Sequence, residues 1–174
     1  MSQPDRLKTD CSRCAALCCV MLAFDKGEDF GFDKNPCEPC RNLDTHKCKI
    51  HDTLAQDGFR GCVAYDCLGA GNRVIQEVFG GTSWQSEPRL MPVMMEAFSA
   101  MREVHKRIDL LRAAAILSLD PDEEQRRLEF LAQLEDHPWT ASELNAFEFG
   151  LALEIDVYFH GMEKHLNELV SAAR

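Results

Sequence analysis

The sequence lacks any apolar run that could cross a membrane, which takes about 18 consecutive apolar residues. Its first ten residues, MSQPDRLKTD, also lack the apolar segment of about 7 to 15 residues that a secretory signal requires. These two absences predict a cytoplasmic protein with no membrane partner.

The chain also lacks an excess of positive charge. It has 19 Lys and Arg against 29 Asp and Glu, a formal net charge of −10, and both halves are acidic. A protein that grips nucleic acid normally brings a basic face to neutralise phosphates. The charge balance therefore predicts that nucleic acid is not a partner.

The short motifs of several enzyme classes are missing too. The chain contains no H-E-x-x-H, no H-x-E with P-C-x-x-C, no G-x-S-x-G, no P-loop and no C-x3-C-x2-C. No Glu is followed three residues later by His, which excludes the paired E-x-x-H motif of di-iron bundles. Catalytic residues are unknown, and enzymatic activity stays open because a metal ion with a free coordination position can still act on a substrate.

The last 107 residues contain no cysteine, so all nine thiols lie between Cys11 and Cys67. They form C-x2-C-x3-C-C, then C-x2-C-x7-C-x2-H, then C-x4-C. Thiols stay reduced in the cytosol, where a dense cysteine pattern indicates metal binding or catalysis rather than a disulfide framework. The odd number of cysteines, and the strain of a bridge between adjacent Cys18 and Cys19, also argue against disulfides.

Clustered thiolates are the preferred ligands of structural zinc, and four of them also hold an iron–sulfur cluster. On a short helix Cys19 would point away from Cys14 and Cys18, which predicts that the Cys18-Cys19 pair serves more than one metal. Cys37 is an extra or alternative thiol, and the spacing does not divide the ligands between ions. Two or more zinc ions are favoured, with iron or [4Fe-4S] as the alternative. The predicted ligands are Cys11, Cys14, Cys18, Cys19, Cys40, Cys48, His51, Cys62 and Cys67.

The pattern of the chain changes near residue 88, which predicts a cysteine-rich metal-binding module over 1–87 and a helical bundle over 88–174. Gly, Pro, Asp and Cys recur in the first segment and leave room only for short helices. We expect these at Ser12–Leu22, Asp52–Asp57 and Asn72–Phe79, with the last ended by Gly80-Gly81.

Apolar residues recur at helical spacing in the second segment. One helix is expected from Pro92 to about Leu119, and a second from an Asp120 N-cap to a point before Pro138. Thr140 with Glu143 predicts a capping box that opens a last helix reaching Leu169, with bends at Gly150 and Gly161. The expected fold is mostly α: a small metal-stabilised module packed on an antiparallel helical bundle.

Three segments, CSRCAALCC, PCRNLDTHKCKIH and GCVAYDC, resemble the CxxCxxCC zinc- or iron-chelating family, the YkgJ-like cysteine-cluster proteins. The chain departs from that pattern in the extra Cys37, in the three residues between its second and third cysteines, and in Gly58-Phe59-Arg60-Gly61 where the family usually has Arg-Pro. The stretch after Asp66 is similar to the leading segment of some bacterial pentapeptide-repeat proteins, without the repeats. Some relatives resemble protein lysine N-methylases, which implies an iron–sulfur cluster. The matching positions are Cys11, Cys14, Cys18, Cys19, Cys40, Cys48, Ile50, His51, Cys62 and Cys67.

Three functions follow as hypotheses. The first is a zinc-folded module that, with the helical bundle, binds a protein or peptide partner. The second is an iron or iron–sulfur enzyme, or a redox protein, that modifies a peptide or protein. The third is a protein that stores or delivers zinc or iron.

Overall fold

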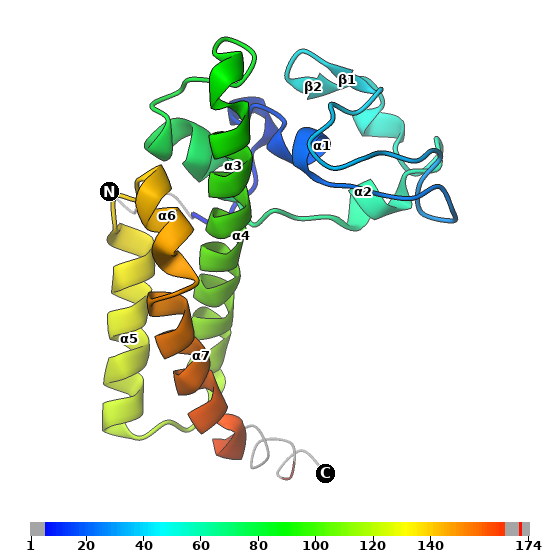
Figure 1. The fold of residues 1–174 in the computed structure, drawn as a ribbon. Helices are drawn as coiled ribbons and strands as arrows, with labels where there is room; N and C mark the ends of the chain where they lie inside the picture. The colour runs from blue at the N-terminus through cyan, green and yellow to red at the C-terminus, as the bar shows by residue number, and fades with distance from the viewer. Residues whose placement is uncertain (1–5, 166–170, 172–174) are drawn as a thin grey trace.

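The computed structural model describes residues 6–165 and 171. The fold is mostly α: several helices pack into an elongated bundle, and a head of loops and short elements projects from one end of it (Figure 1). Among the described residues, no helix is both long and apolar enough to span a membrane.

The bundle is built on the 23-residue helix α4, Met91–Ala113, which is followed by a 3-10 turn at Ala114–Ile116. Helix α5, Pro121–Asp136, runs alongside α4, and α6, Ala141–Phe147, and α7, Leu151–Gly161, follow each other along the same side of the bundle (Figure 1). The expected apolar stripe of α4 is confirmed. Its fully buried side chains are Met94, Phe98, Met101, Val104, Ile108 and Leu111.

Both expected N-terminal caps of the bundle are present. The Asp120 carboxylate accepts a hydrogen bond from the Glu123 amide at 2.9 Å, and the Glu123 carboxylate accepts one from the Asp120 amide at 3.0 Å. Thr140 and Glu143 form the same reciprocal pair at the start of α6. These boxes satisfy amide groups that the first turn of a helix leaves without partners, so local sequence fixes where α5 and α6 begin.

The last predicted helix is interrupted, which the sequence suggested only as a bend. Gly150 adopts φ −131° and ψ −106°, outside the helical region, so that α6 ends at Phe147 and α7 starts at Leu151. Gly161 is the last residue of α7. The predicted continuation to Leu169 lies outside the described residues.

The head contains short elements separated by loops. They are the 3-10 turn η1 at Cys11–Arg13, α1 at Leu17–Met21, strands β1 at Leu43–Asp44 and β2 at Lys47–Cys48, the 3-10 turn η2 at His51–Thr53, and α2 at Arg60–Ala64. The strands pair antiparallel with Leu43 opposite Cys48, a hairpin that the sequence did not predict.

The single helix predicted over Ser12–Leu22 is wrong. Ala16 takes a left-handed conformation with φ 55°, which no α-helix of L-residues tolerates, so η1 and α1 are separate. Cys14 is in an extended conformation at the end of η1. Cys14 and Cys18 therefore do not share one helical face, and their relation depends on the turn between them.

Four phenylalanines give the head a small apolar centre of its own. The rings of Phe24 and Phe30 stack with centroids 4.3 Å apart, and Phe32 and Phe59 meet edge to face at 5.1 Å. Beside them Lys34 is buried, and its ammonium group donates to the carbonyls of Val20, Leu22 and Asn35. Such a centre is small, so other interactions must hold most of the head.

The segment between head and bundle forms α3, Ala70–Arg73, a π-helical turn at Val74–Val78 and a 3-10 turn at Pro88–Leu90. Gly80 and Gly81 have positive φ and follow directly after the helical stretch that ends near Phe79, as expected. Arg73 is buried, and its guanidinium donates to the carbonyls of Leu134, Glu135 and His137 at 2.9 to 3.0 Å. It thereby satisfies carbonyl groups at the C-terminal end of α5.

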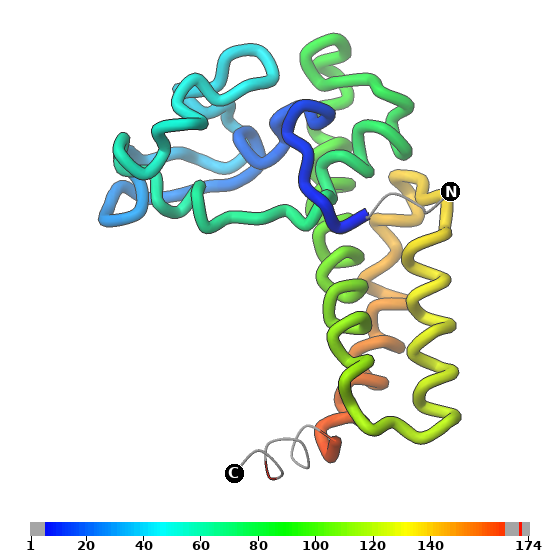
Figure 2. The backbone as a smooth tube through the Cα atoms, turned by 180° about the vertical axis from the view of Figure 1, so that it is seen from behind, coloured from blue at the N-terminus to red at the C-terminus, as the bar shows by residue number. Residues whose placement is uncertain are grey.

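Seen from behind, two stretches of chain connect the head to the bundle (Figure 2). One is the stretch after residue 6 that leads to η1, and the other is the return from α2 to α3. They lie close together, since the Asp10 amide donates to the Asn72 side chain at 3.0 Å. The boundary predicted at residue 88 remains a prediction.

Candidate metal centre

All nine cysteines lie within the described residues, and each is a free thiol. Cys67 is buried, Cys11 and Cys37 are exposed, and the others are half-buried. They come from separate loops and short elements of the head, so any shared site has to be assembled by long-range contacts.

The first such contact joins the beginning of the head to its end. The Thr9 hydroxyl donates to the Asp66 carboxylate at 2.6 Å and lies 3.5 Å from the Cys67 sulfur. Asp10 and Asn72 exchange hydrogen bonds between backbone and side chain. These bonds hold the opening cysteines next to Cys67, the last one in the chain.

Electrostatic interactions identify the thiols that lie near one another on this side. Burial raises the pKa of Cys14 to about 12, and the neighbouring Cys18 and Cys67 raise it as well. The pKa of Cys11 is raised by partial desolvation first and then by the same two thiols. The first thiol group is therefore Cys11, Cys14, Cys18 and Cys67.

A glycine leaves room for the sulfur of Cys14. A Cβ atom built on Gly71 in α3 would lie 2.6 Å from Cys14 Sγ, well inside the ordinary contact range of 3.4 to 4 Å. The amides of Leu17 and Ala16 donate hydrogen bonds to the same thiol, which favours its thiolate form. Cys14 thus lies in a fitted cradle between the Ala16 turn and α3.

The second side of the head brings together later cysteines. The Cys40 amide donates to the Cys19 carbonyl at 2.9 Å, and the β hairpin returns the chain at Cys48. Burial raises the pKa of Cys62 to about 11, and Cys40, Cys18 and Cys48 add to the shift. The second thiol group is therefore Cys18, Cys40, Cys48 and Cys62.

Cys18 belongs to both groups, and its sulfur lies 4.0 Å from that of Cys19. The hydrogen bond with Cys19, then burial, then the charge of Cys19 hold the pKa of Cys18 far above its ordinary range. Negative charge on these thiols is unfavourable because like charges lie close together in a partly desolvated site. A bound divalent cation would reverse this electrostatic balance.

Two predicted or possible ligands are exposed and belong to neither group. The His51 side chain is 63% exposed, with its Nδ1 3.4 Å from the Asp52 carboxylate. Cys37 is exposed with a positive φ of 60°. Within residues 6–165 and 171, no three His, Cys, Asp or Glu side chains meet the geometry of a ready-formed metal site. The ligand assignments therefore remain predictions.

Some residues near the thiols were not predicted from the sequence. The buried Lys34 lies close enough to Cys40, Cys19 and Cys37 for their charges to oppose the lowering of its pKa by burial. Tyr65 lies near Cys18 and Cys67, whose charges add to the effect of burial in raising the pKa of its hydroxyl. The position of Tyr65 inside C-x4-C was the available signal, whereas nothing in the local sequence marked Lys34.

The comparisons with known proteins give one relative and no family. No protein-family profile matches the chain, and no solved structure matches it. The chain is 43% identical over 115 residues to the uncharacterized protein YybG of Bacillus subtilis (strain 168). The match covers 66% of this chain and 40% of YybG, so the chain spans about two fifths of that relative.

The donor set fits a thiophilic metal. Each group offers four sulfur atoms, the number that a tetrahedral zinc site or an iron–sulfur cluster uses. The backbone amides of Leu17 and Ala16 favour the thiolate form of Cys14, whereas burial, the larger effect, opposes it; a bound cation would offset that opposition. Cys11, Cys14, Cys18 and Cys67 would hold one ion, and Cys40, Cys48 and Cys62 would hold another together with Cys18 or Cys19.

Proposed function

We propose that this chain is a metal-binding protein whose head is folded around a multinuclear thiolate site, with two or more zinc ions as the favoured metal. What supports the proposal is that the Cys18 sulfur lies 4.0 Å from that of Cys19 and that Cys18 raises the pKa of thiols from both ends of the head. Because Cys18 acts on both groups, it is suited to bridge two ions or to bind one ion beside Cys19.

Binding energy from the metal would stabilise the fold of the head. Its elements are at most five residues long, and its aromatic centre contains only four rings. Domains with so little apolar core usually need metal ions or disulfides. For structural zinc the binding free energy adds directly to folding stability.

The chemistry of the metal is tested by elemental analysis and an absorption spectrum on anaerobically purified full-length protein. We expect at least two zinc ions per chain and no visible absorption. Iron with acid-labile sulfide would instead support the alternative, an iron–sulfur enzyme or redox protein that modifies a peptide or protein. The matched control is C37S, which should retain the metal content of the wild type because Cys37 is exposed and outside both groups.

The structural role of the metal is tested with a chelator. Removal of zinc should lower the free energy of unfolding of the whole chain, as measured by circular dichroism in urea, and should make the head more sensitive to protease. A free energy of unfolding that is the same with and without metal would contradict a structural role. Rapid exchange of zinc with a chelator, without loss of fold, would favour storage or delivery of zinc or iron.

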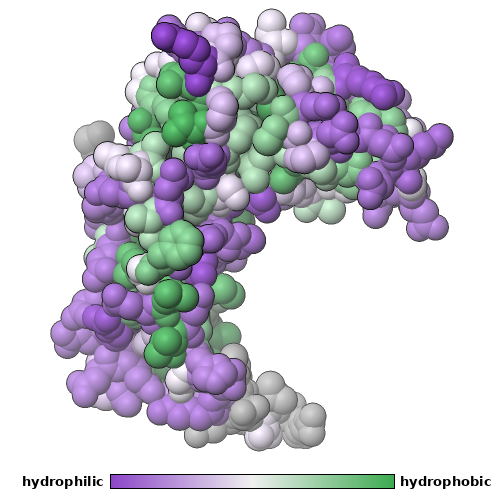
Figure 3. Space-filling model, in the orientation of Figure 1, coloured by the Kyte–Doolittle hydropathy of each residue, from purple (hydrophilic) through white to green (hydrophobic). Residues whose placement is uncertain are grey.

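We also propose a surface for a protein or peptide partner on α7. Leu153 and Val157 of α7 are 56% and 74% exposed and lie one helical turn apart, and Phe149, in the turn before α7, is 84% exposed. They form an apolar stripe on the face of the bundle over α6 and α7 (Figure 3). A groove of about 440 Å³ beside it, between α5 and α7, is lined in part by Phe130 and Tyr158.

The occupant that fits this stripe is an amphipathic helix with basic flanks. The segment around the stripe is acidic, since residues 72–174 carry ten basic against eighteen acidic side chains. Glu154 and Asp156 already pair with Arg126 and Arg107, so Glu148 is the acidic residue of this segment that is left for a basic flank. Apolar anchors at i and i+4 with complementary charge are the usual mode of helix-in-groove recognition.

Fluorescence anisotropy with a labelled Leu-Lys amphipathic helix tests this surface, with a Leu-Glu helix as the charge control. Binding of the Leu-Lys helix should be lost in a Phe149→Ser, Val157→Ser variant and retained in Val63→Ser, which changes an apolar residue of the head that is 60% exposed. Equal binding of the two peptides would contradict the basic flank, and unchanged binding by the double variant would contradict the location.

A further inference from the structure

The Tyr65 hydroxyl is shielded from solvent and has no hydrogen-bond partner among the described residues. Nearly all buried polar groups in proteins have partners, because leaving a buried donor unsatisfied is costly. A hydroxyl placed in this way is suited to donate a hydrogen bond to a nearby acceptor.

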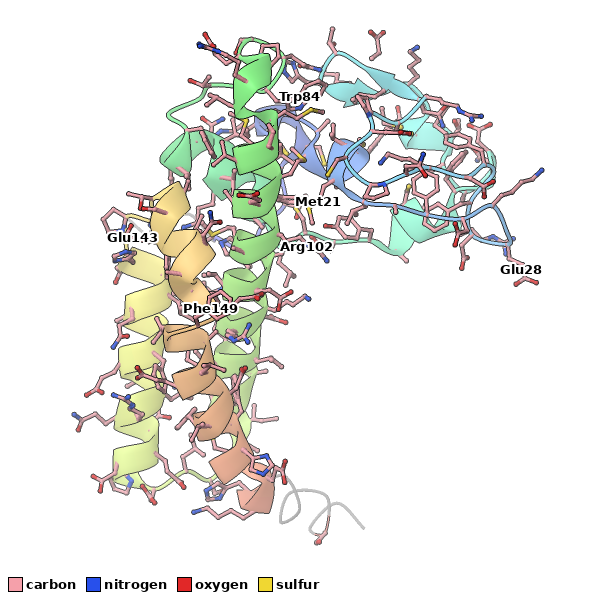
Figure 4. All side chains as sticks on the ribbon, viewed as in Figure 1. Met21, Glu28, Trp84, Arg102, Glu143 and Phe149 are labelled. Carbon is pink, nitrogen blue, oxygen red and sulfur yellow. The ribbon has the colours of Figure 1, made fainter. Side chains whose placement is uncertain are left out.

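The surroundings of Tyr65 narrow the identity of that acceptor. Tyr65 comes two residues before Cys67, and, after burial, the charges of Cys18 and Cys67 raise the pKa of its hydroxyl; both thiols belong to the first thiol group. Arg102 lies over the ring, with its guanidinium carbon 5.2 Å from the ring centre. Figure 4 places Arg102 on α4 in the inner corner between bundle and head.

Helix α4 also fixes the backbone next to Tyr65. His105, one turn after Arg102, is fully buried, and its Nδ1 hydrogen-bonds to the carbonyl of Leu68. Leu68 follows Cys67 directly and has a positive φ of 51°. The long bundle helix therefore positions both the closing cysteine and the tyrosine three residues before Leu68.

A metal-bound thiolate is the acceptor that suits this arrangement. A neutral thiol accepts hydrogen bonds weakly, whereas a thiolate carries negative charge and charge-assisted hydrogen bonds are the stronger ones. Four thiolates around one divalent ion also leave the centre with a net negative charge, which a nearby cation stabilises. Arg102 forms no ion pair that the structure records among the described residues, so its charge is available for this purpose.

We propose that Tyr65 and Arg102 are positioning residues for an anionic metal–tetrathiolate centre: the Tyr65 hydroxyl donates a hydrogen bond to the metal-bound sulfur of Cys18 or Cys67, and the Arg102 guanidinium offsets the charge of the centre. This inference rests on the proposed metal-binding function. Groups that orient and hydrogen-bond to metal ligands typically change metal affinity by about 10- to 100-fold.

The test uses Co²⁺ as a probe on full-length protein under anaerobic conditions. Tyr65→Phe removes only the hydroxyl and should bind the same number of Co²⁺ ions as the wild type, with affinity at one site reduced about tenfold or more. The sulfur-to-cobalt charge-transfer band of that site should move to lower energy, because a thiolate that loses a hydrogen bond gives up charge more easily. The metal-free variant should be as stable as the wild type or slightly more stable.

Tyr158→Phe is the matched control. The Tyr158 hydroxyl donates to the backbone carbonyl of Glu123 at 2.9 Å, far from the thiols in sequence and within the bundle. This variant should lose stability without metal and leave the Co²⁺ affinity and spectrum unchanged. Arg102→Met should weaken Co²⁺ binding at the same site as Tyr65→Phe, and Arg102→Lys, which retains the charge, should restore most of the affinity.

The outcomes separate the two proposals. A wild-type protein that binds no Co²⁺ would overturn the metal-binding function and, with it, this inference. Stoichiometric binding with identical affinity and spectrum in wild type and Tyr65→Phe would overturn the inference alone. Loss of stability in the metal-free Tyr65→Phe variant would also overturn it, because the hydroxyl would then serve the fold.

Discussion

Replacement of Gly71 by alanine should lower the metal affinity of this protein without lowering the stability of its metal-free form. In the structure the new methyl group would lie 2.6 Å from Cys14 Sγ, about 0.8 Å inside the shortest ordinary contact. A free thiol can rotate away from it, and alanine within a helix is favoured over glycine by about 0.5 to 1 kcal/mol. The free energy of unfolding of metal-free protein should therefore stay the same or rise slightly.

In the metal-bound state the Cys14 sulfur would be fixed by its ion and could not rotate. Insertion of a methyl group into a filled site that cannot relax costs about 1 to 3 kcal/mol. Since each 1.4 kcal/mol corresponds to a factor of ten in affinity, Gly71→Ala should weaken the binding of one metal ion by about 5- to 150-fold.

The assay is competition for zinc with a chromophoric chelator, paired with urea unfolding of metal-free protein. Gly161→Ala is the matched control, because a Cβ at Gly161 would meet no atom within 4 Å and should not change zinc affinity. In a Cys14→Ser background Gly71→Ala should no longer affect affinity. Zinc binding by Gly71→Ala that equals wild type would refute the assignment of Cys14 as a ligand, and so would an effect that persists in the Cys14→Ser background.

Three further predictions concern other parts of the chain. Cys18→Ser should weaken binding of both metal ions, whereas Cys67→Ser should weaken one, as measured by isothermal titration with zinc; equal effects would contradict the shared position of Cys18. Burial lowers the pKa of His105 to about 4, so between pH 6.5 and 4 the unfolded chain binds a proton that the folded chain does not. As the pH falls through that window, metal-free protein should lose up to about 1.4 kcal/mol of stability per pH unit. His105→Gln should flatten this pH dependence in urea titrations at several pH values. Arg73→Met removes three hydrogen bonds to the end of α5 and should lower the free energy of unfolding by about 3 kcal/mol, with Arg73→Lys intermediate; a loss under about 1 kcal/mol would show that these carbonyls find other partners.

The bundle was predictable because its information is local. Apolar residues such as Phe98 and Met101 repeat at helical spacing, and their burial follows from that period. Asp120 and Thr140 mark helix starts through hydrogen bonds to residues three positions away. The break at Gly150 was harder to foresee, because glycine permits a break without requiring one.

For the head, the sequence supports a hypothesis about chemistry but little about shape. Its cysteine spacing indicated metal ligands, but the left-handed Ala16 and the short hairpin have no periodic signal. Which thiols become neighbours depends on contacts between distant segments, such as the amide of Cys40 with the carbonyl of Cys19. Such contacts join residues far apart in the chain and leave no local pattern from which they could be predicted.

The guanidinium of Arg73 has a consequence for how the whole chain melts. It lies six residues after Cys67, yet its hydrogen bonds end on carbonyls of residues 134 to 137. Unfolding of the head would thus break the Arg73 hydrogen bonds to the end of α5, and fraying of α5 would remove the same bonds from α3. Head and bundle should therefore unfold in one cooperative transition whose midpoint rises with metal concentration, even though only the head holds the thiols.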